Sequence, residues 1–324
     1  MLLDLSCLSY PLPPDVRRLY EAGDFGRMEL VIRRRLDDPC VPEALKARLR
    51  VQLEMAYEIP RAYPYTRAQM LDILQKNVSG FAEEELETLR DDGTLDWRYV
   101  NGEVRFKNNA LSALLKTRKE YAMRATDPAV MSGTKASAEQ LSAMIAKMKA
   151  NGGVRARFEL HEELTVRSDR LTEGETLRIH LPMPIVGAQV KRAELLSASH
   201  PVAFLAPEDE PQRTIYFELP YEPGMTVSAE IAYEIDAPYA QPHAREVYAE
   251  QPVFDTEELP PHVVFTPYLR ALAKEIVGDE TNALLKARKI YDFITTQAVY
   301  RFMPPYLTVP NIPEYFLSGL RGDC

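Results

Sequence analysis

The chain has 324 residues, of which 46% are hydrophobic and 27% charged, and its formal net charge is −9 at pH 7. This length and composition predict two or three domains with real hydrophobic cores and exclude wholesale disorder, while the negative charge disfavours nucleic acid as the main partner. The chain has no apolar run of about 18 residues and no basic leader, so we expect a cytoplasmic protein without a membrane partner.

Residues 1–125 are predicted to form a helical domain. Apolar residues recur at helical spacing in Asp15–Gly23, Phe25–Leu36 and Pro42–Ile59, and the first of these segments ends on a glycine. We expect these three helices to serve packing alone.

The second half of this domain changes to the order helix, helix, hairpin, helix. Thr66 can cap a helix over Arg67–Asn77, and a second helix is expected over Ala82–Arg90. Asn101-Gly102, between two short apolar segments that include Trp97, is a strong signal for a β-hairpin over residues 97–106. This order is the outline of a winged helix.

The second of these helices is acidic. It carries Glu83, Glu84, Glu85 and Glu87, which would repel phosphate groups and offer few hydrogen-bond donors to base edges. A structural role or a protein contact is therefore favoured over DNA binding.

Residues 126–153 are predicted to connect two domains. We expect a loop at Ser132–Thr134, then a helix from about Ser137 to Lys149 that ends at Asn151-Gly152-Gly153. It carries Leu141, Met144, Ile145 and Met148, and its methionines are expected to fill a core.

Residues 154–240 change to a period of two and predict a small antiparallel β-sandwich. Apolar and polar residues alternate in the segments 154–160, 177–181, 215–219 and 227–235, with turn signals at Glu173-Gly174 and Pro223-Gly224. His180 lies among apolar neighbours but would face outward, so we expect a surface residue. Residues 241–262 are rich in proline and acidic side chains and predict an extended linker.

The last segment, residues 263–324, begins with two predicted helices. One covers Pro267–Gly278, and Thr281 can cap the next, which places Leu284 and Tyr291 on one face. An extended run follows from Tyr300, with prolines at positions 304, 305, 310 and 313.

The segment Ala287–Ile294, then Tyr300, a proline-rich loop and Leu317–Cys324 resemble the opening of the transglutaminase-like superfamily core, a papain-like cysteine fold. Upstream, Thr176–Pro184 resembles the small β-domain that precedes this core in many bacterial members. The expected fold class is α+β: an N-terminal helical domain with a winged-helix-like part, an antiparallel β-sandwich, and the first helices of a transglutaminase-like core.

The resemblance implies that Cys324 is the catalytic nucleophile at the head of a central helix. Gly322 would allow a sharp turn of the backbone into that helix, Asp323 is a suitable N-cap, and the helix N-terminus would lower the pKa of the thiol. The histidine and aspartate partners would follow Cys324 and are absent from this chain, so we expect a chain truncated at its nucleophile and inactive alone. His262 precedes the cysteine, contrary to the order in the family.

The other cysteines, Cys7 and Cys40, are too scattered to form a disulfide framework or a zinc site with Cys324, and no metal or cofactor is expected. We expect the Cys324 thiol to be more acidic than the other two.

The predicted reaction is thiol acyl transfer on an amide of a protein or peptide substrate, resolved by water (peptidase or amidase) or by a lysine amine (cross-linking). Two alternatives stay open, a non-catalytic protein-binding scaffold and a winged-helix nucleic-acid binder. The sequence indicates no oligomeric state.

Overall fold

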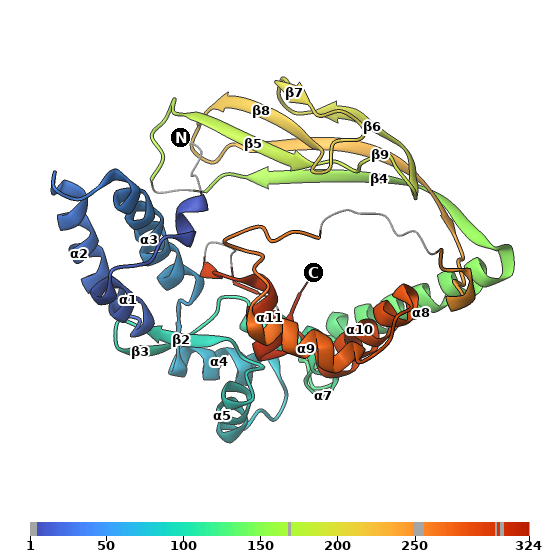
Figure 1. The fold of residues 1–324 in the computed structure, drawn as a ribbon, viewed down its shortest axis with the longest axis horizontal. Coiled ribbons are helices and arrows are strands. Elements are labelled where there is room, and N and C mark those ends of the chain that lie inside the picture. Colours follow the sequence, from blue (N-terminus) through green and yellow to red (C-terminus); the bar gives the residue numbers. More distant parts are fainter. Residues whose placement is uncertain (1–4, 168–169, 249–255, 302, 305–307, 324) are drawn as a thin grey trace. The chain divides into compact units, whose positions relative to one another are not determined.

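The computed structural model describes residues 5–167, 170–248, 256–301, 303–304 and 308–323. The fold is mixed α/β with small, mainly antiparallel sheets (Figure 1). The chain forms two compact units, one made of residues 1–134 together with 243–324, and one made of residues 135–242.

The N-terminal part of the first unit contains the elements η1 (Leu5–Ser9), α1 (Pro14–Glu21), α2 (Phe25–Asp37), α3 (Glu43–Ala62), β1 (Tyr65–Thr66), α4 (Arg67–Asn77), α5 (Glu83–Asp91), β2 (Trp97–Val100), β3 (Glu103–Phe106), α6 (Ala110–Thr117) and α7 (Lys119–Ala122). The C-terminal part of the same unit adds η2 (Ala244–Glu246), α9 (Pro267–Val277), α10 (Ala283–Gln297), β10 (Val299–Tyr300), α11 (Ile312–Gly319) and β11 (Arg321–Gly322). Helix α8 (Pro128–Asn151) runs from the first unit into the second, which contains β4 (Gly153–Thr165), β5 (Thr176–Pro182), β6 (Val190–Ala198), β7 (Phe204–Leu205), β8 (Thr214–Pro220) and β9 (Thr226–Pro238).

Helices α1, α2 and α3 confirm the three predicted packing helices and enclose one apolar core. Its buried side chains come from one face of each helix, and they include Val16, Phe25, Met28, Ile32, Leu49, Val51, Met55 and Ile59.

The turn between α1 and α2 lies directly against the β2–β3 hairpin. Gly23 has a φ of +70°, and a Cβ atom there would lie 2.1 Å from the carbonyl oxygen of Tyr99. The amide of Asn101 donates a hydrogen bond of 2.7 Å to the carbonyl of Gly23, and its side-chain oxygen accepts one of 3.0 Å from Gly26. The turn therefore needs a residue without a side chain.

The predicted order of helices and hairpin between residues 65 and 121 is confirmed. Thr66 and Gln69 form a capping box at the start of α4, and the hairpin pairs Trp97 with Phe106. The last predicted helix is divided into α6 and α7. A second core lies between these elements, with Met70, Leu74, Leu86, Leu89, Leu95, Phe106 and Leu114 almost fully buried.

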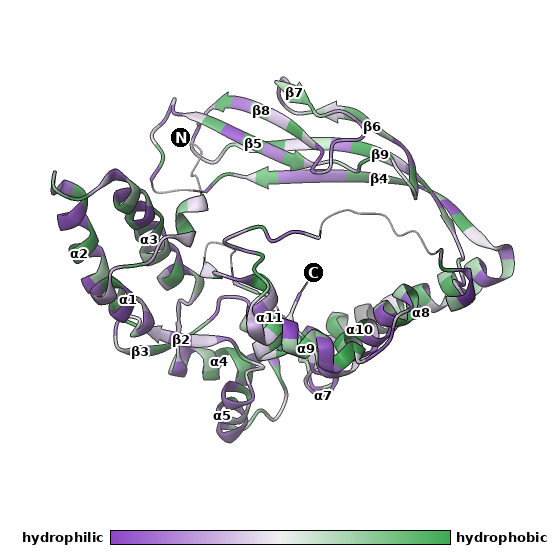
Figure 2. Ribbon diagram, in the orientation of Figure 1, coloured by the Kyte–Doolittle hydropathy of each residue, from purple (hydrophilic) through white to green (hydrophobic). Residues whose placement is uncertain are grey.

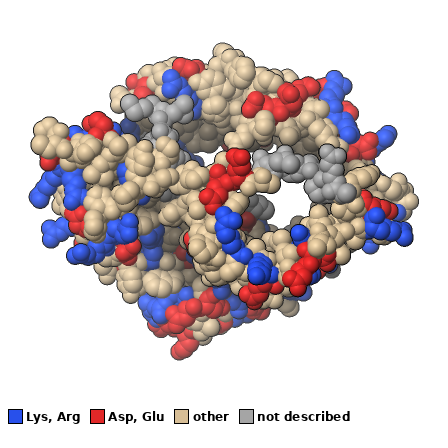
Figure 3. Space-filling view, viewed as in Figure 1, with Lys and Arg blue, Asp and Glu red and all other residues tan. Residues whose placement is uncertain are grey.

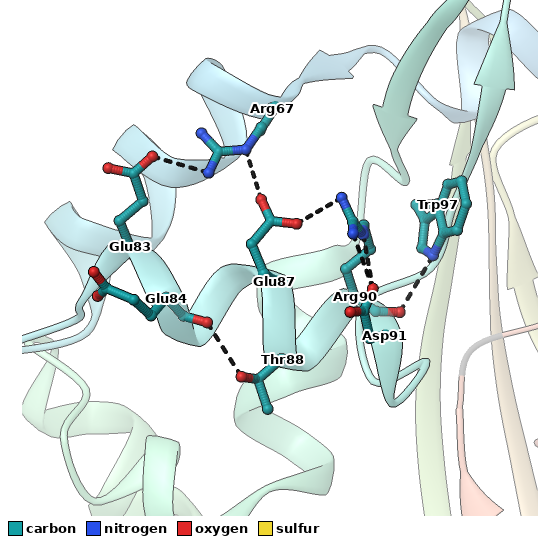
Figure 4. A network of polar contacts seen from close by, with 8 residues as sticks. All are labelled: Arg67, Glu83, Glu84, Glu87, Thr88, Arg90, Asp91 and Trp97. Carbon is teal, nitrogen blue, oxygen red and sulfur yellow. Dashed lines mark hydrogen bonds and ion pairs between the residues drawn. The ribbon is translucent and has the colours of Figure 1, made fainter.

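Three of the four glutamates of α5 are paired with arginines of the same unit. Figure 4 shows Glu83 and Glu87 against Arg67, at 2.9 and 2.6 Å, and Glu87 also against Arg90. A third carboxylate, Glu85, accepts two hydrogen bonds from Arg124, at 2.7 and 3.0 Å, and they hold the pKa of Glu85 at about 2. Helix α5 is among the most hydrophilic elements in Figure 2, as its sequence requires.

The second unit consists of two three-stranded antiparallel sheets, β4-β9-β6 and β5-β8-β7, around one apolar core. Ile179, Ile215, Phe217, Val227 and Ile231 are buried in it, as the alternation of their segments predicts. Strands β6 and β7 were not predicted. Register shifts after Val190 and Leu195 interrupt the alternation along β6, which removes the period-two signal.

The predicted loop at Ser132–Thr134 is wrong, because α8 is continuous through these residues. A single glycine costs a helix only about 1 kcal/mol, so the Ser-Gly-Thr sequence does not end it. The predicted core role of its methionines is wrong for Met144, which is 38% exposed, while Met148 is half-buried; Leu141 and Ile145 of the same helix are 62% and 41% exposed.

None of the helices in the described parts of the chain combines the length and the apolar character that a membrane span requires. His180 is exposed, as predicted, and its Nδ1 lies 2.9 Å from the hydroxyl of Thr214.

Candidate functional site

The segment that leads toward Cys324 begins with the two predicted helices, α9 and α10. Thr266 caps α9 by accepting a hydrogen bond from the amide of Leu269. The predicted cap of α10 is wrong by one residue: Asn282, and not Thr281, accepts hydrogen bonds from the amides of Leu284 and Leu285. Both residue types can cap a helix, and here the residue directly before the first helical position takes the role.

The proline-rich stretch is shorter than predicted. Helix α11 starts at Ile312, so Pro313 lies in its first turn and not in an extended segment. A proline is tolerated there because its missing amide hydrogen would have no partner within the helix.

Strands β10 and β11 form a parallel pair that holds the last described residues. The amides of Val299 and Arg301 donate hydrogen bonds of 2.9 and 2.8 Å to the carbonyls of Leu320 and Gly322. Leu320 takes the left-handed conformation at the end of α11, with a φ of +48°.

The predicted reason for Gly322, a sharp turn of the backbone, is wrong. Gly322 lies in β11 and has no positive φ, whereas a Cβ atom there would lie 2.6 Å from the ring of Phe316. Close packing against an aromatic ring therefore requires this glycine.

Asp323 is fixed by a short chain of hydrogen bonds. Its Oδ2 accepts a hydrogen bond of 3.0 Å from the amide of Met303, and the carbonyl of Met303 accepts one of 2.7 Å from Nζ of Lys107. Cys324, the predicted nucleophile, lies outside the described residues, so the N-cap role of Asp323 stays a prediction.

A buried polar network centred on Asp96 holds this segment against the hairpin. The Tyr63 hydroxyl donates a hydrogen bond of 2.9 Å to Asp96, Arg301 forms an ion pair with it, and Nζ of Lys107 lies 4.0 Å from it. The side chains of Asp96, Lys107 and Arg301 are only 11%, 6% and 18% exposed. Together with Asp323, the network contains two acidic and two basic groups, so its formal charges balance.

Burial controls the protonation of this network. Burial lowers the pKa of Lys107. The positive charge of Arg301 lowers it further, whereas the negative charges of Asp96 and Asp323 raise it. Burial raises the pKa of Tyr63 and of Tyr315, in each case with a further upward contribution from Asp96. Both phenols therefore stay neutral and can donate hydrogen bonds at physiological pH.

Three further contacts fix the segment. Nζ of Lys116 donates a hydrogen bond of 3.3 Å to the hydroxyl of Tyr300 and lies 4.5 Å from the centre of its ring. The guanidinium of Arg321 donates to the carbonyl of Asp92, and the hydroxyl of Tyr268 to that of Leu317. Tyr300, which is part of the family resemblance, therefore contacts helix α6 through Lys116.

A cleft of about 280 Å³ lies in this region of the first unit. Tyr63 lines it at the end of α3, Arg98 lines it from β2, and Pro304 and Thr308 line it from the C-terminal segment. Arg98 also lies over the rings of Tyr20, Phe25 and Tyr63 at 5.5 to 5.8 Å.

Sequence reasoning missed Asp96, Lys107 and Arg301. The first two could have been predicted to lie together. Trp97 pairs with Phe106, so Asp96, directly before β2, and Lys107, directly after β3, lie opposite each other. Lys107 and Met303 are 196 positions apart, and no local pattern joins them.

His262 contributes its main chain to the segment, since its carbonyl accepts a hydrogen bond of 2.9 Å from Ile312. Cys7 is buried and Cys40 is exposed, and neither is in a disulfide with a described residue. No group of three or more His, Cys, Asp or Glu side chains in the described parts of the chain could hold a metal ion.

Comparisons of the chain with family models, with curated proteins and with solved structures found no match.

Proposed function

We propose that the chain is the N-terminal portion of a transglutaminase-like cysteine enzyme in which Cys324 is the nucleophile of thiol acyl transfer on a protein or peptide amide. One observation carries this proposal: the β10–β11 pair and the Met303–Asp323 hydrogen bond fix the residue before Cys324. A nucleophile needs a backbone held in one position, because effective catalysis depends on the geometry of attack.

The order of the elements supports the proposal. Helix α10, which contains Ala287–Ile294, and then β10, which contains Tyr300, precede Leu317–Asp323 in the order that the resemblance requires, whereas helix α11 was not part of it. We assign the start of the core to residues 263–324, the linker to 241–262, a β-sandwich to 154–240, a helical connector to 126–153 and a helical domain with a winged-helix-like hairpin to 1–125.

The formal charges around Asp323 are balanced and include two cations. Lys107 and Arg301 are cations within the same network, and nearby positive charge stabilises a thiolate over a thiol. The negative charges of Asp96 and Asp323 oppose this effect. The net effect of the network on the pKa of the Cys324 thiol therefore depends on which of the four charges lie nearest to it. The neutral phenols of Tyr63 and Tyr315 add no negative charge.

The proposed reaction has two steps. The Cys324 thiolate attacks the amide carbonyl carbon, the C–N bond breaks, and the amine leaves with a proton from a general acid, which leaves a thioester on the enzyme. Water or a lysine amine then attacks the thioester, gives up a proton to the general base and releases the thiol. The histidine and carboxylate for these proton transfers would follow Cys324, so the chain alone is expected to show no turnover.

Thiol alkylation tests the proposal. In the polypeptide that continues past Cys324, we expect iodoacetamide to alkylate Cys324 with a midpoint at least about one pH unit below that of Cys40, because the helix N-terminus that the resemblance implies at Cys324 favours the thiolate. The two rates are measured by mass spectrometry of peptides across pH, and Cys324→Ser removes one signal as the control. Equal pH profiles for both thiols would contradict the proposal.

A non-catalytic protein-binding scaffold is the second candidate, and the exposure of α9 and α10 favours it. No side chain of either helix is buried, and Tyr291, Tyr268 and Ile294 are 57%, 45% and 38% exposed. An apolar helix face of this kind suits a protein partner. A partner that binds the Cys324→Ser variant unchanged, together with an unreactive Cys324, would favour this alternative.

We propose no nucleic-acid partner. The acidic side chains of α5 face any phosphate that would approach this helix, and Arg67, Arg90 and Arg124 are already paired with them. Over α4 and α5, acidic and basic side chains lie next to each other on the face drawn in Figure 3. A phosphate backbone needs a continuous cationic surface instead.

A further inference from the structure

Arg48 on α3 is a buried cation that has no carboxylate partner among the described residues. The residue is only 7% exposed, and its Nη1 donates a hydrogen bond of 3.1 Å to the neutral side-chain oxygen of Gln52, which is fully buried. Its Nε is buried and has no hydrogen-bond partner. A guanidinium has five donors in a planar fork, so this arrangement leaves most of its capacity unused.

Such an arrangement is costly for a protein interior. Buried charges are normally paired or fully hydrogen-bonded, because desolvation strongly disfavours the charged form. The ionisable groups whose charges act on Arg48 are the thiol of Cys7 and the phenol of Tyr20, and burial outweighs both and lowers the pKa of Arg48. No carboxylate among the described residues forms an ion pair with it. An anion from outside the chain would supply the missing partner.

Arg48 also lines a cleft large enough for a ligand. The cleft holds about 500 Å³ within the first unit, and Gln52 lies beside Arg48 in its wall. The rest of the wall is largely apolar and includes Leu8, Leu12, Tyr20 and Met55. Such a site combines one charged group with a hydrophobic surround, as small-molecule sites usually do.

The charges at the cleft indicate the charge of the ligand. Arg17 and Glu21, both exposed, line it in addition to Arg48, so its formal charge is +1, from two cations and one anion. A ligand with a single negative charge balances this set. A doubly charged phosphate would leave an excess negative charge in the cleft, which the carboxylate of Glu21 would repel. A carboxylate offers two oxygens that match the guanidinium fork.

We propose that this cleft binds a singly charged organic carboxylate with an apolar body, and that Arg48 binds the carboxylate group while the body packs on the apolar wall. The site is independent of Cys324 and of the acyl-transfer proposal.

Calorimetric titration of the whole chain with N-acetyl-leucine tests the site. We expect saturable binding at millimolar or lower concentration, and no binding of N-acetyl-leucinamide, which has the same body without the charge. Arg48→Gln is expected to weaken binding of the acid at least about thirty-fold, because it removes the buried partner of the carboxylate. Arg50→Gln is the matched control: Arg50 lies on the same helix, is 54% exposed and pairs with Glu43, so its replacement leaves binding unchanged.

The contrast between acid and amide is measured on the unaltered chain and does not depend on whether Arg48→Gln folds. Equal binding of the acid and the amide would overturn the proposal. So would no binding of the acid, an equal loss in the Arg50→Gln variant, or tighter binding of inorganic phosphate than of the acid. A peptide Ala-Ala-Ala-Leu with a free carboxylate separates two supporting outcomes: binding equal to that of N-acetyl-leucine indicates a chain terminus as ligand, and no binding of the peptide indicates a small acid.

Discussion

Replacing Asp96 by asparagine is expected to lower the free energy of unfolding of the first unit by about 3–5 kcal/mol, the cost typical of breaking a buried ion pair from one side. Asparagine keeps the size of the side chain and an oxygen that can accept the hydrogen bond from Tyr63. It removes one of the two negative charges that balance Lys107 and Arg301, whose side chains are only 6% and 18% exposed. The effect therefore reports the charge and not the shape of the side chain.

Denaturant unfolding followed by tryptophan fluorescence measures this loss. Trp97 is the only tryptophan of the chain and follows Asp96 directly, so the signal reports the first unit. Asp91→Asn is the control, because Asp91 is 68% exposed and its ion pair with Arg90 is expected to contribute at most about 1 kcal/mol. Equal effects of the two substitutions would show that the Asp96 network does not stabilise the unit.

The same substitution is expected to loosen the segment that ends at Asp323. Hydrogen exchange of the amides of Val299 and Arg301, which donate across the β10–β11 pair, should accelerate in the Asp96→Asn variant because Arg301 loses its partner. Unchanged exchange at these two amides would show that the Asp96 network does not hold the segment that ends at Asp323.

Replacing Gly23 by alanine is expected to cost the first unit about 2–5 kcal/mol. About 1–2 kcal/mol comes from the left-handed conformation, which a side chain disfavours, and about 1–3 kcal/mol from a forced shift in a packed region. The added Cβ atom would meet the carbonyl oxygen of Tyr99 at 2.1 Å, and backbone cannot move aside as a flexible side chain can.

Gly80→Ala separates the two contributions. Gly80 has a φ of +65°, close to that of Gly23, but no atom lies within 4 Å of the added Cβ. Its replacement is expected to cost only the conformational part, and the difference between the variants in denaturant unfolding gives the cost of the contact with Tyr99. A difference near zero would mean that the α1–α2 turn and the hairpin are not packed together in solution.

Much of the secondary structure could be predicted, and the reason is visible in particular segments. Helices α1 to α5 have apolar residues at regular helical spacing, with a glycine after α1 and a capping threonine before α4, and the β2–β3 hairpin has an Asn-Gly turn. Both signals depend only on neighbouring residues, so they can be recognised in the sequence without knowledge of the fold. Strand β6 was missed because its register shifts break the alternation.

The candidate site shows where sequence reasoning ends. The position of the segment 299–323 depends on Asp96, Lys107 and Arg301, whose charges meet only after the chain has folded back over nearly two hundred residues. The role of Gly322 was misjudged for a similar reason, since its contact with Phe316 exists only once β11 pairs with β10. Local patterns indicate which groups are available, and tertiary packing decides which of them meet.

The most direct test of the proposed function is mass spectrometry of the polypeptide that continues past Cys324, after incubation with a glutamine-containing peptide. We expect a covalent adduct on Cys324 whose mass equals the peptide less the amine that is released, and no adduct in the Cys324→Ala variant. An adduct that survives Cys324→Ala, no adduct on Cys324 in the unaltered polypeptide, or a parent sequence without a histidine after Cys324 would contradict the assignment of this residue as the nucleophile.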